Sequence, residues 1–277
     1  MRVLVTGSEG RVASGIKQHL DSDDSDHEFV YLDREAAPDV DHVADVSAYE
    51  EIRPAFDGVD AVVHLAADPH VSATWESVEQ SNLVGTRNVL EAAADAEVER
   101  FLFASSIHAA GMWEEEGKPD VYELDDDTNV TVDDDERPDS YYGVSKAYGE
   151  DMGRFYIEQR EYPKRFYAAR IASVRGGLYD NPYGDAEQGV ENGDWERGSD
   201  EYTEQVKRLK GTWLSLRDWA QLVELCLTDE DTEFGIFFAT SDNPRSWFDL
   251  KHTKELLGYE PQDSASDWQS PPRELLE

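Results

Sequence analysis

The sequence predicts an α/β fold built on a doubly wound parallel sheet. Short apolar runs alternate four times with helical segments between residues 2 and 106. These runs are apolar for nearly their whole length, which is typical of parallel strands covered by helices on both faces. Strict alternation of strand and helix favours right-handed crossovers. A glycine-rich turn follows the first apolar run, as expected where a strand leads into a helix at a ligand site.

The elements follow in chain order. The predicted strands are residues 2–7, 28–33, 60–67, 99–106, 165–173 and 233–241, and the predicted helices are 10–20, a stretch near 49–56, 75–94, 140–160, 215–227 and 247–258. Ser215 and Asp218 have the spacing of a helix capping box. Residues 111–139 and 175–202 show no clear period, and we interpret them as irregular insertions, the first a solvated acidic excursion. Since no internal repeat occurs, we expect a single domain, residues 1–277, with a small loop-rich C-terminal cap mainly in 174–215 and 240–277.

The charge of the chain is extreme. The sequence has 62 acidic and 25 basic residues, a formal net charge of −37. At molar salt the Debye length falls to about 3 Å, and the repulsion among carboxylates is screened. The charge therefore indicates a protein adapted to a very salty cell interior. A basic protein partner is the alternative, disfavoured because the charge lies in no single block. Nucleic acid is excluded as a partner, because no segment supplies a basic stripe.

Composition also bears on location. Hydrophobic residues make up 39% of the chain, which includes seven Trp, so the chain is not a disordered acidic tail. No uninterrupted apolar window long enough for a membrane helix occurs, and the first residues turn glycine-rich before a signal core. Cys226 is the only cysteine, which excludes a disulfide or a thiolate metal site within the chain. We expect a cytoplasmic protein without membrane contact or metal.

The first motif is the turn TGSEGRVA. Gly7, Gly10 and Ala13 give the spacing G-x-x-G-x-x-A, which lets backbone amides and a helix N-terminus approach a pyrophosphate. Asp33 ends the second strand, where its carboxylate accepts both ribose hydroxyls of a dinucleotide and repels a 2′-phosphate. The motif predicts a Rossmann dinucleotide site that favours NAD over NADP, although the neighbouring Arg34 leaves NADP open.

The second motif is Tyr142-Gly-Val-Ser-Lys146. Four residues apart on a helix, the tyrosine and the lysine project from one face, and an ammonium beside a phenol favours the phenolate. Ser106, at the end of a strand, lies where open α/β sheets place their ligands. Together with the nucleotide turn, these residues indicate proton transfer beside a dinucleotide rather than a solvated helix pair.

In this order and spacing, the motifs resemble the extended short-chain dehydrogenase/reductase superfamily: TGSEGRVA, LDR, HLAA, the N-x-x-G-T run from Asn82 to Thr86, FASS and YYGVSK. The chain resembles short uronate dehydrogenases and haloarchaeal NAD-dependent glucose-6-phosphate dehydrogenase more than the longer NDP-sugar epimerases, through SSIHAAG, TWLSLRDW and LGYEPQDSA. The resemblance covers nearly the whole chain except the two acidic insertions.

This resemblance implies roles for particular residues. The implied catalytic trio is Ser106, Tyr142 and Lys146. The implied NAD site comprises Gly7, Gly10, Arg11, Val12, Asp33, Arg34, Asp45, Val46, Leu65, Ala66, Ala67, Asn82, Tyr142, Lys146 and Ile171. The implied sugar contacts are Ser106, His108, Tyr142, Ser173 and Arg208. A guanidinium at Arg208 suits a carboxylate or phosphate, which implies an acidic sugar.

Two positions depart from the family pattern. Ile107 stands where relatives have a substrate-binding Asn, and Pro69 stands where bacterial uronate enzymes have a Ser. Both changes remove polar contacts, so a neutral or less hydroxylated aldose is also compatible with the sequence. His108 matches a family histidine but is equally compatible with a structural role.

The resemblance implies an NAD-dependent oxidoreductase that converts the anomeric hydroxyl of a uronate, sugar phosphate or aldose to a lactone in a halophile. One alternative is an NDP-sugar epimerase or dehydratase of the same superfamily, and another is a non-catalytic NAD-binding regulator, which the intact trio disfavours. By analogy at the level of the fold, the helices that begin at Trp75 and Tyr142 pair across a homodimer or a higher homo-oligomer.

Overall fold

The computed structural model describes residues 1–276 and contains a seven-stranded parallel sheet of order β3-β2-β1-β4-β5-β6-β7. The strands are β1 Arg2–Thr6, β2 Glu28–Asp33, β3 His42–Val43, β4 Ala61–His64, β5 Arg100–Ser106, β6 Arg165–Ile171 and β7 Phe234–Ala239. Strand order runs outward in one direction from β1 to β3 and in the other from β4 to β7. This reversal defines a doubly wound sheet and confirms the predicted fold class.

Helices connect the strands. The α-helices of the described residues are α1 Arg11–His19, α2 Tyr49–Ile52, α3 Trp75–Val78, α4 Gly85–Asp95, α5 Met112–Gly117, α6 Tyr141–Gln159, α7 Gly184–Asn192, α8 Asp200–Thr212, α9 Leu216–Thr228 and α10 Leu250–Leu257. Single turns of 3-10 helix are η1 Arg53–Phe56, η3 Ile107–Ala110, η4 Asp120–Tyr122, η5 Gly177–Tyr179, η6 Ala265–Asp267 and η7 Arg273–Leu275, and η2 Glu79–Val84 is a π-helix. None of the helices in residues 1–276 has both the length and the apolar character to cross a membrane.

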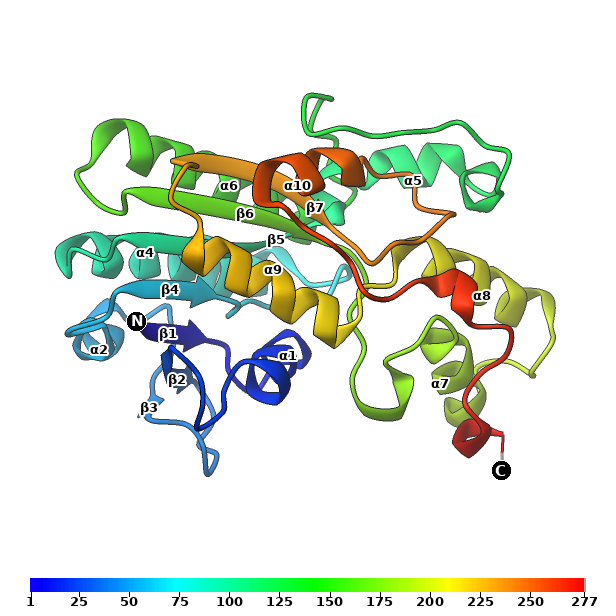
Figure 1. Ribbon diagram of the computed structural model, residues 1–277, viewed down its shortest axis with the longest axis horizontal. Helices are drawn as coiled ribbons and strands as arrows, with labels where there is room; N and C mark the ends of the chain where they lie inside the picture. The colour runs from blue at the N-terminus through cyan, green and yellow to red at the C-terminus, as the bar shows by residue number, and fades with distance from the viewer. Residues whose placement is uncertain (277) are drawn as a thin grey trace.

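Both faces of the sheet are covered, with α1 and α9 on one side and α4 and α6 on the other (Figure 1). Within β1, Val3 and Val5 belong to the first apolar cluster, whereas Leu4 between them belongs to the second. All three side chains are fully buried, which explains why the strand sequence shows no polar alternation. Beyond the sheet, α7 and α8 pack on each other through a separate small cluster that includes Tyr183 and Tyr202 (Figure 1).

Two segments that the sequence predicted as irregular contain helices, so those predictions were wrong in part. Residues 111–139 include α5 and η4, and Glu114 and Tyr122 are buried rather than solvated. Residues 175–202 include α7, in which the buried Glu187 accepts hydrogen bonds from Arg197 and Tyr202. Each of these buried carboxylates pairs with an arginine, Glu114 with Arg208 and Glu187 with Arg197, and a count of charges along the sequence does not reveal such pairing.

Smaller differences concern helix and strand boundaries. The short strand β3 was not predicted, and the single helix predicted for 75–94 is divided into α3, η2 and α4. Only one of the two hydrogen bonds of the predicted capping box forms at the start of α9. Ser215 Oγ accepts the N–H of Asp218 at 3.0 Å, but the N–H of Ser215 donates to Ser241 Oγ, and Ser241 in turn donates to the Asp218 carboxylate.

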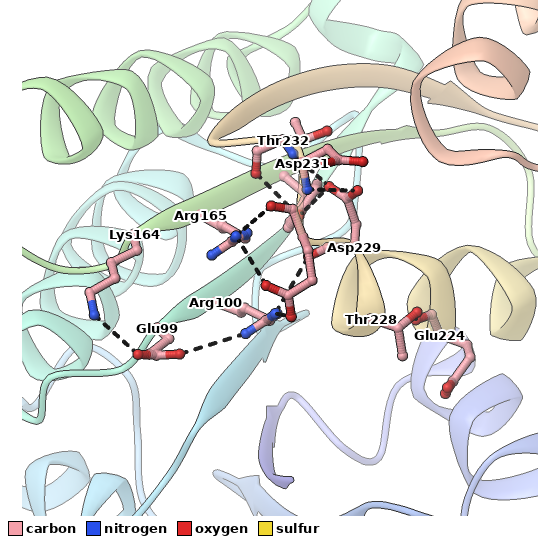
Figure 2. A network of polar contacts seen from close by, with 11 residues as sticks. Glu99, Arg100, Lys164, Arg165, Glu224, Thr228, Asp229, Asp231 and Thr232 are labelled. Atoms are coloured by element: carbon pink, nitrogen blue, oxygen red, sulfur yellow. Dashed lines mark hydrogen bonds and ion pairs between the residues drawn. The ribbon is translucent and has the colours of Figure 1, made fainter.

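An ion-pair network joins the amino ends of β5 and β6 to the loop before β7 (Figure 2). Arg100, buried at the start of β5, donates to the carboxylate of Glu230, which Arg165 of β6 also approaches at 3.2 Å. Lys164 pairs with Glu99 at 3.1 Å nearby. Because Arg100 and Arg165 begin their strands, the network lies at the amino ends of the strands, opposite their carboxyl ends.

Replacing Arg100 with methionine is expected to lower the free energy of unfolding by about 2 kcal/mol, because it removes charge-assisted hydrogen bonds and keeps the apolar stem. Denaturant titration in molar KCl measures the loss. The control, Lys164→Met, removes a half-exposed pair of the same network and should cause a much smaller loss. Equal losses in the two variants, or a changed turnover number, would contradict this assignment.

Candidate active site

A cavity of about 800 Å³ lies at the carboxyl ends of the strands. Residues that directly follow β1, β2, β4, β5 and β6 line it, together with residues of α6 and α8. It brings together every predicted site residue except Asn82: Gly7, Gly10, Arg11, Val12, Asp33, Arg34, Asp45, Val46, Leu65, Ala66, Ala67, Ser106, His108, Tyr142, Lys146, Ile171, Ser173 and Arg208. The residues predicted to bind a dinucleotide and those predicted to bind a sugar thus share one cavity.

The glycine turn, which was predicted to bind the dinucleotide, lines the cavity. Gly7 has φ of +72°, a conformation that side chains rarely adopt, and a Cβ there would lie 2.6 Å from the backbone N of Ala66. Gly10 is the N-cap of α1 and offers no side chain, so the first amides of the helix stay open toward the cavity. The turn, or glycine cradle, therefore offers open backbone amides to a pyrophosphate, and a side chain at position 7 would collide with the backbone of Leu65 and Ala66.

Asp33, which was predicted to bind the adenosine ribose, lines the same cavity. The end of β2 carries it, and its two carboxylate oxygens accept the N–H groups of Glu9 at 2.9 Å and Glu35 at 3.1 Å. These bonds fix the carboxylate and leave further lone pairs on both oxygens for the two ribose hydroxyls. Arg34 also lines the cavity, with its side chain 70% exposed. A carboxylate fixed in this way suits the ribose hydroxyls of NAD.

The predicted catalytic trio converges from β5 and α6. Ser106 ends β5, Tyr142 lies in the first turn of α6, and Lys146 follows one turn later. Lys146 Nζ donates to the carbonyl of Ala104 at 2.8 Å and lies 5.2 Å from the centre of the Tyr142 ring. Burial raises the pKa of Tyr142, and the nearby hydroxyl of Ser106 opposes this rise only in part. All three side chains reach one end of the cavity.

A close approach at Gly143 holds the start of α6 against the turn that follows Ser106. A Cβ at position 143 would collide with the carbonyl oxygen of His108. Ser140 caps the helix by accepting the N–H of Gly143 at 3.0 Å, which fixes where α6 begins. The sequence Ser140-x-x-Gly143 thereby sets Tyr142 beside the end of β5.

Ionisation of the trio differs from the sequence-based expectation. Burial raises the pKa of Tyr142 to about 12, whereas the spacing predicted that the ammonium would lower it. Burial also lowers the pKa of Lys146 to about 7, against the opposing charge of Glu150. Above about pH 7 the two side chains therefore hold one proton between them rather than two. A phenolate beside an ammonium has this same proton count, so the reactive form needs only a shift of that proton.

A buried ion pair between Glu150 and Arg170 holds the helix of Tyr142 and Lys146 on the sheet. Glu150, one turn after Lys146 on α6, accepts two hydrogen bonds from Arg170 of β6, at 3.0 and 2.7 Å, and one from Ser105 of β5. Both charged side chains are 1% exposed. Because removing one member of a buried pair leaves an uncompensated charge, this contact fixes α6 on the sheet.

The cavity lining also includes His108, Ser173 and Arg208, the residues predicted to contact a sugar. His108 Nδ1 lies 2.6 Å from Asp139, and its ring packs edge-on to Tyr142 with 5.8 Å between the ring centres. Ser173 Oγ accepts the hydroxyl of Thr212 at 2.9 Å. The carboxylate of Glu114 binds Arg208 bidentately, with Nε to Oε1 at 2.6 Å and Nη2 to Oε2 at 3.2 Å.

Asn82 does not line the cavity. Its amide binds the backbone of Asp68 and donates to Ser145 Oγ at 2.9 Å, so it ties η2 to α6 behind the site. Sequence reasoning missed Arg175, which also lines the cavity, and Glu114, which binds Arg208 from behind. Neither gave a signal in the sequence, because both lie in the segments without period. Residues 1–276 contain no cluster of His, Cys, Asp or Glu suited to a metal.

The glycine cradle, the fixed strand-end carboxylate and the converging Ser, Tyr and Lys define a dinucleotide-binding oxidoreductase fold of the short-chain dehydrogenase/reductase type. The sequence profile described as "NAD dependent epimerase/dehydratase family" matches residues 3–220, and the chain belongs to that family. The match confirms the predicted superfamily and the predicted cofactor, NAD.

Named relatives agree with this class. The chain is 35% identical to an NAD-dependent glucose-6-phosphate dehydrogenase of Haloferax volcanii, covering 96% of this chain and 95% of the relative. It is 32% identical to an L-arabinose 1-dehydrogenase (NAD(P)(+)) of the same organism, covering 96% and 98%. A solved glucuronic acid dehydrogenase from Chromohalobacter salexigens superposes with a TM-score of 0.73 at 27% identity, over 97% of this chain and 86% of that one.

Proposed function

We propose that this protein is an NAD-dependent sugar dehydrogenase that oxidises the anomeric hydroxyl of a uronate, a sugar phosphate or an aldose to a lactone. The observation that carries the proposal is the convergence of Ser106, Tyr142 and Lys146 at one end of a cavity whose other end is the glycine cradle with Asp33. The relatives support it, since each is named as a dehydrogenase of a sugar or a sugar acid.

Each side chain of the trio has a role in this proposal. Tyr142 accepts the proton of the sugar hydroxyl as the general base. Ser106 donates a hydrogen bond to the reacting oxygen and orients it. Lys146 supplies the positive charge that favours the phenolate, and its ammonium holds the ribose next to the nicotinamide. When bound, NAD supplies the redox chemistry by accepting a hydride.

The remaining residues of the cavity hold the cofactor and the sugar. The cofactor would contact Gly7, Gly10, Arg11, Val12, Asp33, Arg34, Asp45, Val46, Leu65, Ala66, Ala67 and Ile171. The sugar would contact Ser106, His108, Tyr142, Ser173 and Arg208, next to cap elements in 174–215 and 240–277. Asn82 would act on the cofactor only indirectly, through Ser145 on α6.

The test is a scan for NADH formation by its absorbance, with NAD and a panel of uronates, sugar phosphates and neutral aldoses in molar KCl. We expect stoichiometric NADH with at least one sugar. An NDP-sugar epimerase retains its NAD through the cycle and releases no NADH, and a non-catalytic regulator binds NAD without turnover. Conversion of a sugar nucleotide without net NADH would favour the epimerase and contradict the proposal.

Self-association, location and salt adaptation complete the proposal. Trp75 of α3 and Tyr141 of α6 are 42% and 54% exposed and lie edge to face, 5.6 Å apart between ring centres, which supports a homodimer through these helices. A monomer in size-exclusion chromatography at molar KCl would argue against it. The single, fully buried Cys226 suits a cytoplasmic protein, and the net charge of −37 suits molar salt.

A further inference from the structure

We infer that the sugar site takes a neutral aldose, one without carboxylate or phosphate, because Glu114 supplies from within the protein the negative charge that an acidic sugar would bring to Arg208. The inference rests on the proposed function and narrows its substrate class. It opposes the acidic sugar that the sequence resemblance implied from Arg208, because that resemblance did not include Glu114.

Glu114 binds the side of the Arg208 guanidinium that carries Nε and Nη2. The Nε and Nη2 atoms donate to the two carboxylate oxygens, and the hydroxyl of Tyr122 donates to Oε1 at 2.7 Å. Glu114 is 4% exposed, so solvent does not weaken the pair. Although burial opposes it, the charge of Arg208 holds the pKa of Glu114 below its usual range, and the carboxylate stays ionised at the pH of the reaction. A ligand in the cavity meets a guanidinium that is already neutralised.

The other basic side chains at this end of the cavity are compensated as well. Arg175 binds Asp185 through Nε and Nη2, and its Nη1 donates to the carbonyl of Val174 at 2.7 Å. His108 shares its Nδ1 with Asp139. Three basic side chains at this end of the cavity, those of His108, Arg175 and Arg208, thus each have a carboxylate partner of their own.

These pairs make the sugar end suitable for hydroxyl groups rather than for an anion. An added carboxylate or phosphate would gain little attraction from a compensated guanidinium and would be repelled by Glu114 directly behind it. A neutral hydroxyl needs only a donor, which the free N–H groups of Arg208 provide without a net charge. Pro69 and Ile107, which also line the cavity, add apolar surface to the same site.

The first test compares sugars that differ only at carbon 6, assayed with NAD in molar KCl. One set is D-glucose, D-glucuronate and D-glucose 6-phosphate, another is D-galactose and D-galacturonate, and L-arabinose and D-xylose lack the carbon altogether. We expect kcat/KM for the neutral sugars to exceed that for their charged counterparts by at least about tenfold. A charged sugar preferred by the same factor overturns the inference but leaves the proposed function standing, whereas no NADH from any of these sugars refutes the proposed function.

The second test changes the internal charge. Glu114→Gln keeps the shape and the acceptor for Tyr122 but removes the negative charge, so Arg208 becomes free to attract an anion. We expect the ratio of kcat/KM for D-glucuronate to that for D-glucose to rise about tenfold or more, mainly through a lower KM for D-glucuronate. The matched control, Glu116→Gln, removes the same charge from the same helix, where Glu116 is exposed and pairs with Arg137 at 2.6 Å. That ratio should not move in the control.

The two variants separate a role in specificity from a role in folding. NAD binding, followed by tryptophan fluorescence, shows whether each variant is folded. If Glu114→Gln weakens both sugars equally and leaves their ratio unchanged, Glu114 only shapes the fold and the inference is wrong. Should this variant not fold, the carbon-6 comparison on the unaltered protein still decides the substrate class.

Discussion

Tyr142→Phe is expected to lower kcat by about a thousandfold or more, because the change removes the proposed general base and keeps the aromatic ring. The affinity for NAD should change little, since the glycine cradle and Asp33 lie at the other end of the cavity. NADH formation measures the first quantity and tryptophan fluorescence quenching by NAD the second. Ser106→Ala is the graded comparison, with a smaller loss because the base remains.

The pH dependence of the unaltered enzyme provides a second readout of the same base. Above about pH 7, the values for Tyr142 and Lys146 give a pair that shares one proton, and below it the pair holds two and cannot accept the sugar proton. We therefore expect kcat/KM to rise with pH up to about pH 7 and then to level off. Residual activity of Tyr142→Phe with this same profile would show that another group is the base.

Removing salt is expected to unfold the protein. At a net charge of −37, lowering the ionic strength from about 1 M to about 0.01 M lengthens the Debye length from about 3 Å to about 30 Å, so carboxylates repel one another across the surface. Neighbouring exposed side chains such as Asp21, Asp23 and Asp24 carry no opposite charge between them. A loss on the order of 5 kcal/mol equals much of the net stability of a domain.

The measurement is thermal unfolding by circular dichroism, together with NADH formation, along a KCl titration. Both the melting temperature and the activity should fall as KCl is dialysed away and recover when it is restored. Sucrose, which stabilises compact states without screening charge, is the control and should restore less than KCl. An unchanged melting temperature in dilute buffer would falsify the salt adaptation.

The sheet and the cofactor end were predictable because their signals are local. The strand around Val3, Leu4 and Val5 is continuously apolar because helices cover both faces. Gly7 and Asp33 occur at or directly after the end of a strand, and both line the cavity as that position predicts. Tyr142 and Lys146 share a helix face by spacing alone. For these residues, position in the sequence relative to the strands and helices is enough to predict where they lie in the fold.

The sugar end was not predictable in the same way. Glu114 and Arg208 are far apart in the chain and meet only in the folded structure, as do Arg175 and Asp185 across a turn of irregular sequence. Acidic runs suggest a solvated surface, and nothing local distinguishes a carboxylate that binds a buried arginine from one that faces water. The expected lowering of the pKa of Tyr142 failed for a related reason, since burial depends on the whole fold.

The network at Arg100 lies at the amino ends of the strands, and the trio at Tyr142 lies at their carboxyl ends. A substitution that changes stability at the amino ends therefore need not alter the reaction at the carboxyl ends. Low-salt variants become a practical design target: surface aspartates can be exchanged for neutral side chains while the pairs around Glu230 are kept, and the best test of success is a catalyst that works in dilute buffer at an unaltered turnover number.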